Sequence, residues 1–304
     1  MTTDNIIPGR TFNRKITTAP SSSDLQDGEI LVEVLYISLD HAMRGWMSGT
    51  NRPVLPSTIS PLIEFCQDRR NAAAFSPPKA RRPRRAISFP PRNPKTCFLS
   101  PVSLPHAWVG LTRIGDPKSG ELVDVSGAAG ATGSVASQKA KLKGATDVGI
   151  CGSDEKCNWL TNELDFDIGL NYKAVDIQEK FNKTTKSYID VYFNNVGDDI
   201  LDMALGRAKE RARFIECGFI SVFDYVSDFP QARKELAGWL AEGKLKKSEH
   251  ILKGGLQVIE EGPVSLYKGT NTGKLLVEVK NPDDPPQSCK RNFDIAMHHA
   301  RVEG

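Results

Sequence analysis

A glycine-rich turn between a strand pattern and a helix pattern constrains the fold of this chain more than any other feature. Residues 121–126 (ELVDVS) have the apolar, β-branched character of a buried strand. They run into VSGAAGATG at 125–133, after which a helical pattern continues to residue 143. A turn placed directly between a strand and a helix in this way is typical of a dinucleotide-binding βαβ unit. The alternative is a tight turn that binds no ligand.

Two glycines of this turn match the dinucleotide fingerprint. Gly130 stands where the backbone must approach a pyrophosphate, and Gly133 stands where the helix must pack closely on the strand. The amides that open the helix would then face the phosphates, and the helix dipole would add to the attraction. Ala128 occupies the usual place of the first glycine, so the fingerprint is imperfect.

Strand and helix patterns alternate in the residues that follow. The expected elements are strands at 147–151, 189–195 and 212–218 and helices at 154–164 and 200–208. This alternation predicts βαβ units on a parallel sheet. Outside this region we expect a strand at 29–39, a helix at 230–242 and a strand at 274–280.

The end of the second predicted strand favours NADP over NAD. An NAD enzyme usually carries an acid here, which binds the ribose 2′-hydroxyl. In this chain the strand ends Cys151, Gly152, Ser153, and Lys156 follows one helical turn later, so a 2′-phosphate would meet a hydroxyl and an ammonium group. Asp154 is the opposing feature, because it could bind a ribose or cap the helix. Lys156 could also be an ordinary exposed helix residue.

Residues 65–105 differ in composition from the rest of the chain. They are rich in arginine and proline, and Asp68 is their one acid. Since prolines interrupt regular elements and no apolar period is present, we expect an irregular loop. A nucleic-acid-binding arm is the alternative. The few aromatic residues favour the loop, and we expect no nucleic-acid partner.

Overall composition is that of an ordinary globular protein, with 39% hydrophobic and 25% charged residues and a net charge of +3. No stretch approaches the roughly 20 apolar residues that span a bilayer, and the N-terminus lacks the apolar core of a signal peptide. The cysteines are scattered, which favours a reducing, cytoplasmic setting over a disulfide framework. They are Cys66, Cys97, Cys151, Cys157, Cys217 and Cys289.

Metal-dependent and hydrolytic chemistry lacks support in the sequence. The histidines are His41, His106, His250, His298 and His299. None of them pairs with cysteine or glutamate at a spacing typical of zinc ligands, so we expect no metal site. A Ser–His–acid hydrolase is also disfavoured, because no G-x-S-x-G motif is present.

Seven sequence blocks occur in a definite order along the chain. They are GELVDVSGAAGATGSV, VGICGSDEKCNWL, GLNYK, IDVYFNNVG, ARFIECG, WLAEGKLK and GTNTGKLLVEV, with LDHAMRGWM upstream. Together they resemble the prostaglandin reductase (leukotriene 12-hydroxydehydrogenase) branch of the medium-chain dehydrogenase/reductase superfamily, over residues 31–58 and 110–284. The resemblance implies a zinc-independent, NADPH-dependent reductase of the carbon–carbon double bond in α,β-unsaturated carbonyls, usually a homodimer.

The resemblance also implies roles for single residues. Gly130, Ala131 and Gly133 would bind the pyrophosphate, and Ser153 and Lys156 the 2′-phosphate. Tyr172 would line the adenosine phosphate side, and Asn195 would lie beside the nicotinamide ribose. Cys217 and Gly218 would present backbone to the cofactor, and Asn271 would close over its nicotinamide half.

The implied reaction asks little of side chains, because the cofactor delivers hydride to the β-carbon while hydrogen-bond donors stabilise the enolate oxygen. In the resembled family a tyrosine hydroxyl and the nicotinamide ribose hydroxyl can polarise the carbonyl. Tyr225 is the candidate catalytic tyrosine here, and Tyr36 and Tyr267 are weaker candidates.

Three departures from the family pattern concern the substrate side and the sheet edge. Residues 66–101 resemble nothing in the family, Trp108 stands near the place of an expected tyrosine, and a strand–helix piece is absent after Gly218. Asp165 and Asp198 also stand where glycine is usual. Because a sheet without an internal crossover must re-pair or expose an edge, we expect lower stability or solubility than in intact relatives.

The predicted fold is an α/β protein with a Rossmann-type parallel-sheet cofactor domain and a GroES-like, mainly β catalytic domain. The cofactor domain would be truncated and span residues 115–241, and the substrate domain would combine residues 1–114 and 242–304, with the irregular insert at 65–105. The expected ligands are NADP(H) and a small-molecule carbonyl substrate. Two alternatives stay open: an inactive cofactor-binding relative, and a quinone reductase or alcohol dehydrogenase of the same superfamily.

Overall fold

The computed structural model describes residues 13–14, 35–41, 103–216, 222–280 and 295–296. The chain divides into two compact units. Unit 1 comprises Met1–Cys97, Ile251–Thr270 and Leu275–Gly304, and unit 2 comprises Phe98–His250 and Asn271–Lys274.

Unit 2 is built on a five-stranded parallel sheet. Its strand order is β5-β4-β3-β6-β7, and every neighbouring pair is parallel. The strands are β3 (Leu122–Ser126), β4 (Thr146–Cys151), β5 (Ile168–Asn171), β6 (Ile189–Asn194) and β7 (Ala208–Glu216). The order reverses direction at β3, as in a doubly wound nucleotide-binding sheet. The predicted Rossmann-type fold class is confirmed.

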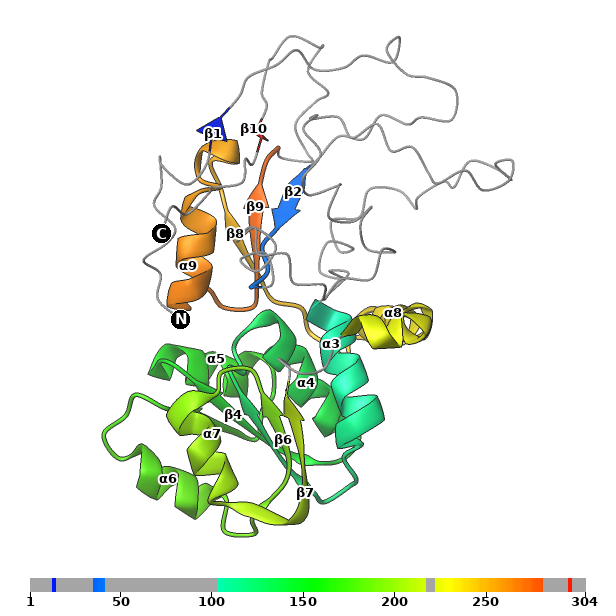
Figure 1. Ribbon diagram of the computed structural model, residues 1–304, viewed down its shortest axis with the longest axis vertical. Helices are drawn as coiled ribbons and strands as arrows, with labels where there is room; N and C mark the ends of the chain where they lie inside the picture. The colour runs from blue at the N-terminus through cyan, green and yellow to red at the C-terminus, as the bar shows by residue number, and fades with distance from the viewer. Residues whose placement is uncertain (1–12, 15–34, 42–102, 217–221, 281–294, 297–304) are drawn as a thin grey trace, which may run out of the picture. The chain divides into compact units, whose positions relative to one another are not determined.

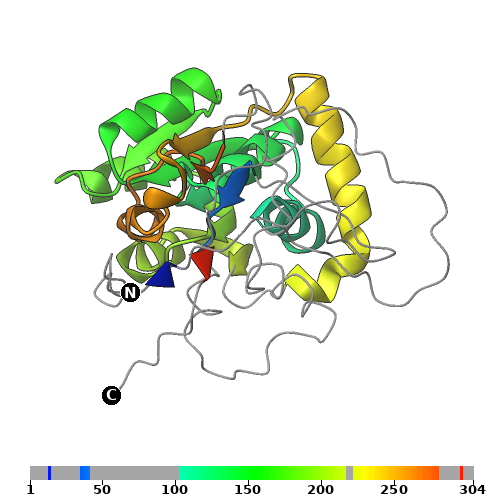
Figure 2. The same cartoon turned by 90° about the horizontal axis from the view of Figure 1, so that it is seen from above.

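Helices cover both faces of this sheet (Figures 1 and 2). One apolar cluster joins the sheet to α4 (Ala131–Leu142), α5 (Asp154–Glu163), α8 (Phe229–Ala241) and α3 (Ser103–Val109), which continues into a π-helical segment, η5 (Gly110–Gly115). A second cluster joins the other face to α6 (Ile177–Thr184) and α7 (Asp198–Leu205). A 3₁₀ segment, η6 (Val222–Asp228), precedes α8.

Unit 2 is wider than the predicted cofactor domain at 115–241. Leu104 and Trp108 of α3 are buried in the first cluster, and so is Leu245 beyond α8. The prediction of an irregular loop over 65–105 is wrong for its last residues, because α3 begins at Ser103 and buries Leu104 completely. Most of that predicted loop lies outside the described residues.

The bounds of two further elements differ from the predicted ones. Strand β7 begins at Ala208, whereas a strand from residue 212 was expected. Helix α7 ends at Leu205, whereas a helix to residue 208 was expected, because Gly206 and Arg207 turn directly into β7. Strand β5 and helix α6 were not predicted at all. Each is short, and Phe181 is the one fully buried residue of α6, so neither produces a clear periodic pattern.

The described part of unit 1 contains a sheet of order β2-β9-β8. Its strands are β2 (Tyr36–Ser38), β9 (Lys274–Glu278) and β8 (Glu249–Leu252), and the last two begin in unit 2. Strand β2 pairs antiparallel with β9. A short 3₁₀ turn, η7 (Gly255–Gln257), and α9 (Glu261–Lys268) follow β8, and β1 (Asn13–Arg14) pairs with β10 (Ile295–Ala296). Leu39, Leu266, Leu275 and Val277 form the core. None of the described helices is long and apolar enough to cross a membrane.

Strand β7 forms one edge of the described parallel sheet. Its first half is exposed and carries Lys209, Glu210 and Arg211. Lys209 pairs with Asp190 of β6 at 2.8 Å. Charged side chains on an edge strand oppose β-strand pairing with another molecule, so these residues lower the tendency of this edge to aggregate.

Two aspartates adopt the left-handed backbone conformation that favours glycine. Asp165 has φ +62° and Asp198 has φ +50°. Both are positions at which the resembled family usually carries glycine. Since a non-glycine residue in this region costs of order 1 kcal/mol, both aspartates are expected to lower stability relative to glycine.

A buried lysine lies between two tryptophans in the first cluster. Lys139 of α4 is 2% exposed, and its Nζ donates to the carbonyl oxygen of Trp108 at 3.2 Å and to the hydroxyl of Thr112. The same ammonium lies 4.4 Å from the ring centre of Trp108 and 5.7 Å from that of Trp239. Burial lowers the pKa of Lys139 to about 7, while Glu235 opposes the shift.

This lysine predicts a pH-dependent stability. Between pH 7 and about pH 10 the unfolded chain binds a proton at Lys139 that the folded chain does not, so folding stability rises with pH in this window. We expect the free energy of unfolding of wild type, minus that of Lys139→Met, to rise by about 1–2 kcal/mol from pH 7 to pH 9. Urea unfolding of both proteins at the two pH values measures it, and a constant difference would contradict it. Lys180→Met, on the exposed side of α6, is the matched control.

Candidate functional site: a cofactor cradle in unit 2

The glycine-rich turn lies at the carboxyl end of β3, where nucleotide ligands bind in sheets of this kind. Gly127 has φ +60°, and the amide of Gly130 donates to the carbonyl oxygen of Gly127 at 2.9 Å, which closes the turn. Gly130 is the N-cap of α4 and provides no side chain to cap it. The first amides of the helix, from Ala131 to Gly133, therefore point their partial positive charge toward a bound anion.

The close packing at Gly133 and the open space at Gly130 match the two roles that the fingerprint gives them. A Cβ atom on Gly133 would lie 2.5 Å from the carbonyl oxygen of Gly127 and 2.8 Å from Cα of Ala128, so only glycine fits. A Cβ atom on Gly130 would meet only the same carbonyl oxygen, at 3.2 Å. Among the described residues, no side chain therefore lies in the space over Gly130, and the turn fits a pyrophosphate.

The residues after β4 form the second corner of the site. Ser153 is the N-cap of α5, and its hydroxyl accepts a hydrogen bond from the amide of Lys156 at 3.3 Å. Asp154 does not cap the helix, so the prediction that it could be the helix cap is wrong. Its carboxylate instead accepts from Nδ2 of Asn171 at 2.9 Å, which ties the first turn of α5 to the end of β5.

Lys156 joins this corner to the segment 271–274. Its Nζ donates to the carbonyl oxygen of Asn271 at 2.7 Å, and the Asn271 amide group donates to the carbonyl oxygen of Gly273 at 2.8 Å. The amide of Gly273 in turn donates to the carbonyl oxygen of Ala129 at 2.7 Å. Burial lowers the pKa of Lys156 from its ordinary value. The predicted residues Lys156 and Asn271 thus lie beside the glycine-rich turn.

Tyr172 lies next to the same corner. A Cβ atom on Gly152 would lie 3.2 Å from the ring of Tyr172, so the small residue makes room for the aromatic side chain. The ring is 39% exposed, and Nζ of Lys173 lies 5.6 Å from its centre. An exposed flat ring with a cation beside it can stack on a nucleotide base or contact a phosphate.

Asn195 follows β6 at the same sheet edge. Its Nδ2 donates to the carbonyl oxygen of Ser126 at 2.7 Å, and its amide donates to the Ser126 hydroxyl at 2.8 Å. The next strand contributes Glu216, which accepts from Nδ2 of Asn194 at 2.6 Å. Cys217 and Gly218 lie outside the described residues.

Three residues of this cradle were not foreseen, and only one of them has a local signal. Gly127 adopts a positive φ, and its place in the run Gly-Ala-Ala-Gly is a hint of that. Ser126 and Gly273 form hydrogen bonds with residues far away in the sequence, namely Asn195 and Ala129, and local residue patterns do not reveal such contacts.

The candidate tyrosines lie in three different surroundings. Tyr225, in η6, packs against the apolar cluster around α3 and α8. In unit 1, the Tyr36 hydroxyl donates to Glu278 at 3.4 Å, and the Tyr267 hydroxyl donates to the carbonyl oxygen of His41 at 2.9 Å. Trp108, near the place of the expected tyrosine, is 1% exposed and donates to Glu235 at 2.8 Å, so its part is in packing.

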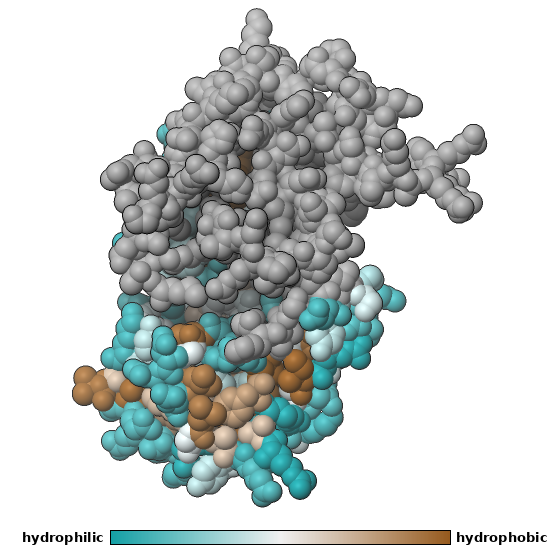
Figure 3. Space-filling view, viewed as in Figure 1, coloured by the Kyte–Doolittle hydropathy of each residue, from teal (hydrophilic) through white to brown (hydrophobic). Residues whose placement is uncertain are grey.

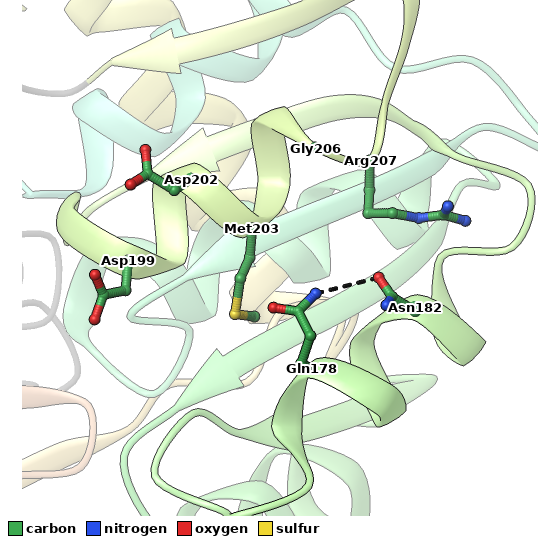
Figure 4. A pocket seen from close by; sticks show the side chains of 7 residues that line it. All are labelled: Gln178, Asn182, Asp199, Asp202, Met203, Gly206 and Arg207. Atoms are coloured by element: carbon green, nitrogen blue, oxygen red, sulfur yellow. Dashed lines mark hydrogen bonds between the residues drawn. The ribbon is translucent and has the colours of Figure 1, made fainter.

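A separate hollow of about 370 Å³ lies between α6 and α7 (Figure 4). It is lined by Gln178, Asn182, Asp199, Asp202, Met203, Gly206 and Arg207. None of these side chains belongs to the cradle, and the hollow does not reach the glycine-rich turn. Within the described ranges, no three histidine, cysteine or acidic side chains gather as a metal site would require.

Comparison with known proteins identifies the family. Residues 131–237 match the family model described as "Zinc-binding dehydrogenase". YfmJ of Bacillus subtilis (strain 168), named as an NADP-dependent oxidoreductase, is 36% identical over 311 residues, which cover 84% of this chain and 90% of that protein. The chain belongs to the medium-chain dehydrogenase/reductase superfamily. Within this superfamily it belongs to the zinc-independent, NADP-dependent reductase branch, as the sequence blocks predicted.

Two further comparisons extend this result. Prostaglandin reductase 1 of Bos taurus is 30% identical over 303 residues, which cover 84% of this chain and 90% of that protein. The crystal structure of CurA from Vibrio vulnificus in complex with NADPH has a TM-score of 0.68 at 24% identity, over 89% of this chain and all of that one. The second likeness supports the two-domain fold of the family.

Proposed function

We propose that this protein is an NADPH-dependent oxidoreductase that reduces the carbon–carbon double bond of α,β-unsaturated carbonyl compounds. The observation that carries the proposal is the joined cradle of unit 2, in which Lys156 and Ser153 lie beside the turn that fits a pyrophosphate. Membership of the NADP-dependent reductase branch supports it. Bound NADPH would supply the hydride for the β-carbon of the substrate.

Each described residue of the cradle has a part in holding the cofactor. The amides at Gly130, Ala131 and Gly133 would bind the pyrophosphate, and the positive end of α4 would stabilise its charge. Ser153 and Lys156 would bind the 2′-phosphate, with Tyr172 on the adenosine side. Asn195 and Asn271 would lie at the nicotinamide half, and Cys217 and Gly218 keep the roles that the family resemblance implies.

Tyr225 is the proposed catalytic residue on the substrate side of the site. Tyr225 would donate a hydrogen bond to the carbonyl oxygen of the substrate and so stabilise the enolate. Purified protein with NADPH and a panel of enones, quinones and alcohols separates the enone reductase from a quinone reductase or an alcohol dehydrogenase. NADPH binding without oxidation by any of the panel would identify an inactive cofactor-binding relative.

Replacement of Lys156 by alanine tests the phosphate corner. A charge-assisted hydrogen bond contributes about 1.5–3 kcal/mol, so we expect Lys156→Ala to raise the Kd for NADPH by roughly 10- to 100-fold. The Kd for NADH should change less than about twofold, because NADH has no 2′-phosphate. Nicotinamide fluorescence during titration measures both constants. Lys180→Ala, whose lysine pairs with Asp176 on the surface of α6, is the matched control. An equal loss for both cofactors would contradict the assignment.

The proposal includes a cytoplasmic homodimer. Val196, just before α7, and Leu205, its last residue, are 48% and 54% exposed. Apolar side chains interrupt the hydrophilic surface of unit 2 (Figure 3). Such side chains are suited to a contact between subunits. Light scattering of the purified protein distinguishes a dimer from a monomer. Free Cys151 and Cys157 suit a reducing compartment.

A further inference from the structure

Two cysteines meet at the phosphate corner of the cradle. Cys151 is the last residue of β4, and Cys157 lies in the first half of α5. Their Sγ atoms are 2.8 Å apart, and both thiols are free. A disulfide bond is about 2.04 Å long, so the sulfur atoms need to approach by only about 0.8 Å. No other part of the cofactor site uses either thiol.

The local structure holds this pair in place. The amide of Cys157 donates to the carbonyl oxygen of Ser153 at 3.1 Å, and the thiol of Cys151 lies 3.6 Å from the same oxygen. Strand β5 closes the other side, because a Cβ atom on Gly169 would lie 2.9–3.1 Å from Cys157. The backbones of the two cysteines therefore stay adjacent while β4, β5 and α5 are folded.

We propose that Cys151 and Cys157 are a redox modification site, at which a reversible disulfide weakens the binding of the NADPH 2′-phosphate by the adjoining turn. The effect on NADPH rests on the proposed function, whereas formation of the disulfide does not. The site would respond to a small oxidant of the hydroperoxide class, since Cys151 is 2% exposed and Cys157 is 9% exposed.

The two thiols are unequal, which gives the reaction a direction. The two thiols share one hydrogen-bond contact, and this contact lowers the pKa of Cys157 and raises that of Cys151. The Cys157 thiolate attacks one oxygen of hydrogen peroxide, the O–O bond breaks, and sulfenic acid and hydroxide form. The Cys151 sulfur then attacks the sulfenic sulfur and expels its oxygen as water. Altogether two thiols and one peroxide give one disulfide and two waters.

Closing the bond would move the residues that hold the phosphate. Gly152, Ser153 and Lys156 lie between the two cysteines, and Lys156 depends on a 2.7 Å hydrogen bond to Asn271 for its position. Drawing the two sulfur atoms about 0.8 Å closer pulls on Cys157, and through it on the first turn of α5. The shift misplaces the groups for the 2′-phosphate and leaves the glycine-rich turn in place.

The test compares the full-length protein before and after treatment with hydrogen peroxide. After blocking of free thiols in denaturant, peptide mass spectrometry of the treated protein should find Cys151 and Cys157 joined and unblocked, and dithiothreitol should reverse the change. We expect the Kd for NADPH to rise by roughly tenfold in the oxidised protein, with the Kd for NADH changed less than twofold. Both cysteines alkylated in the treated sample would overturn the proposal.

Two variants make the outcomes separable. Cys157→Ala should bind NADPH with the same affinity before and after peroxide, whereas Cys289→Ala should respond as wild type does. A disulfide with no change in NADPH affinity would overturn the regulatory part of the proposal. If the reduced protein binds neither cofactor, the proposed function fails, and the peptide map still decides whether the pair is a redox site.

Discussion

Replacing Asp124 with valine should raise the free energy of unfolding by about 3 kcal/mol at pH 8, which is the largest stability change we expect from any single substitution. Asp124 is the middle residue of β3, directly before the glycine-rich turn. It is fully buried, and neither carboxyl oxygen has a hydrogen-bond partner among the described residues. A valine would replace an unsatisfied polar group by an apolar side chain of similar volume.

The neighbours of Asp124 explain why it has no partner. The parallel register places it opposite Val148 of β4 and Tyr192 of β6, on the face that α6 and α7 cover. Both of those residues are fully buried. The Tyr192 hydroxyl is 3.4 Å from Asn194, to which it donates, and does not turn to the carboxyl group. The apolar cluster on this face includes Leu122, Val148 and Phe181, so a valine suits it.

The pH dependence separates the charge of Asp124 from its packing. Burial raises the pKa of this carboxyl group well above its ordinary value. The folded chain therefore keeps a proton that the unfolded chain releases near pH 4, and wild type loses stability as pH rises through this window, by up to about 1.4 kcal/mol per pH unit. The advantage of Asp124→Val should accordingly be larger at pH 8 than at pH 5.

Unfolding in urea at the two pH values measures this difference. Asp147, whose pKa burial and the contact with Asp167 raise to about 8, titrates in both proteins and cancels. Asp124→Asn should flatten the pH dependence with a smaller gain, because it leaves an unpaired polar group. Asp202→Val, at an exposed position of α7, should change stability by less than about 0.5 kcal/mol. Equal stability of wild type and Asp124→Val at pH 8 would refute the expectation.

The sequence was sufficient to predict the parallel sheet and most of its strands, because their alternation with helices is a local pattern. β3, β4 and β6 lie within one residue of their predicted bounds at each end. Strand β5 was not predicted because its four residues are too few to show a period. Helix α6 was not predicted because Phe181 is its one fully buried residue. The residues on either side of Asp124 in the sequence predict a strand, and nothing in them shows that its carboxyl group is buried. The cost of burying that group becomes clear only when the structure places Tyr192 and Val148 beside it.

The cofactor cradle was predictable to a different extent. Gly130 and Gly133 could be assigned because the fingerprint gives each a local steric reason. The contact of Lys156 with Asn271 joins positions 115 residues apart, and no spacing rule reveals it. The thiol pair of Cys151 and Cys157 was equally hidden, since a separation of six positions does not show that the end of a strand and the first turn of a helix face each other. The resemblance supplied what local patterns could not, namely that these distant blocks serve one ligand.

Gly130→Ala should abolish most cofactor binding while the protein stays folded. Alanine accepts the φ of −83° found at Gly130, and its methyl group would meet only the carbonyl oxygen of Gly127, at 3.2 Å. That methyl group would instead fill the space in which the pyrophosphate approaches the backbone. We expect the Kd to rise about 100-fold for NADPH and for NADH alike, which corresponds to roughly 2.7 kcal/mol.

The companion variants show why this result would locate the pyrophosphate. Gly133→Ala should lower the thermal midpoint as well as binding, because its methyl group would lie 2.5 Å from a backbone oxygen that cannot move away. Gly238→Ala, in α8 with open space around it, should bind both cofactors normally and gain up to about 1 kcal/mol of stability. Lys156→Ala should weaken the binding of NADPH alone. If Gly130→Ala weakens the binding of NADPH and NADH equally, then Gly130 contacts a group that both cofactors contain, which is the pyrophosphate. Unchanged affinity of a folded Gly130→Ala protein would place the pyrophosphate elsewhere.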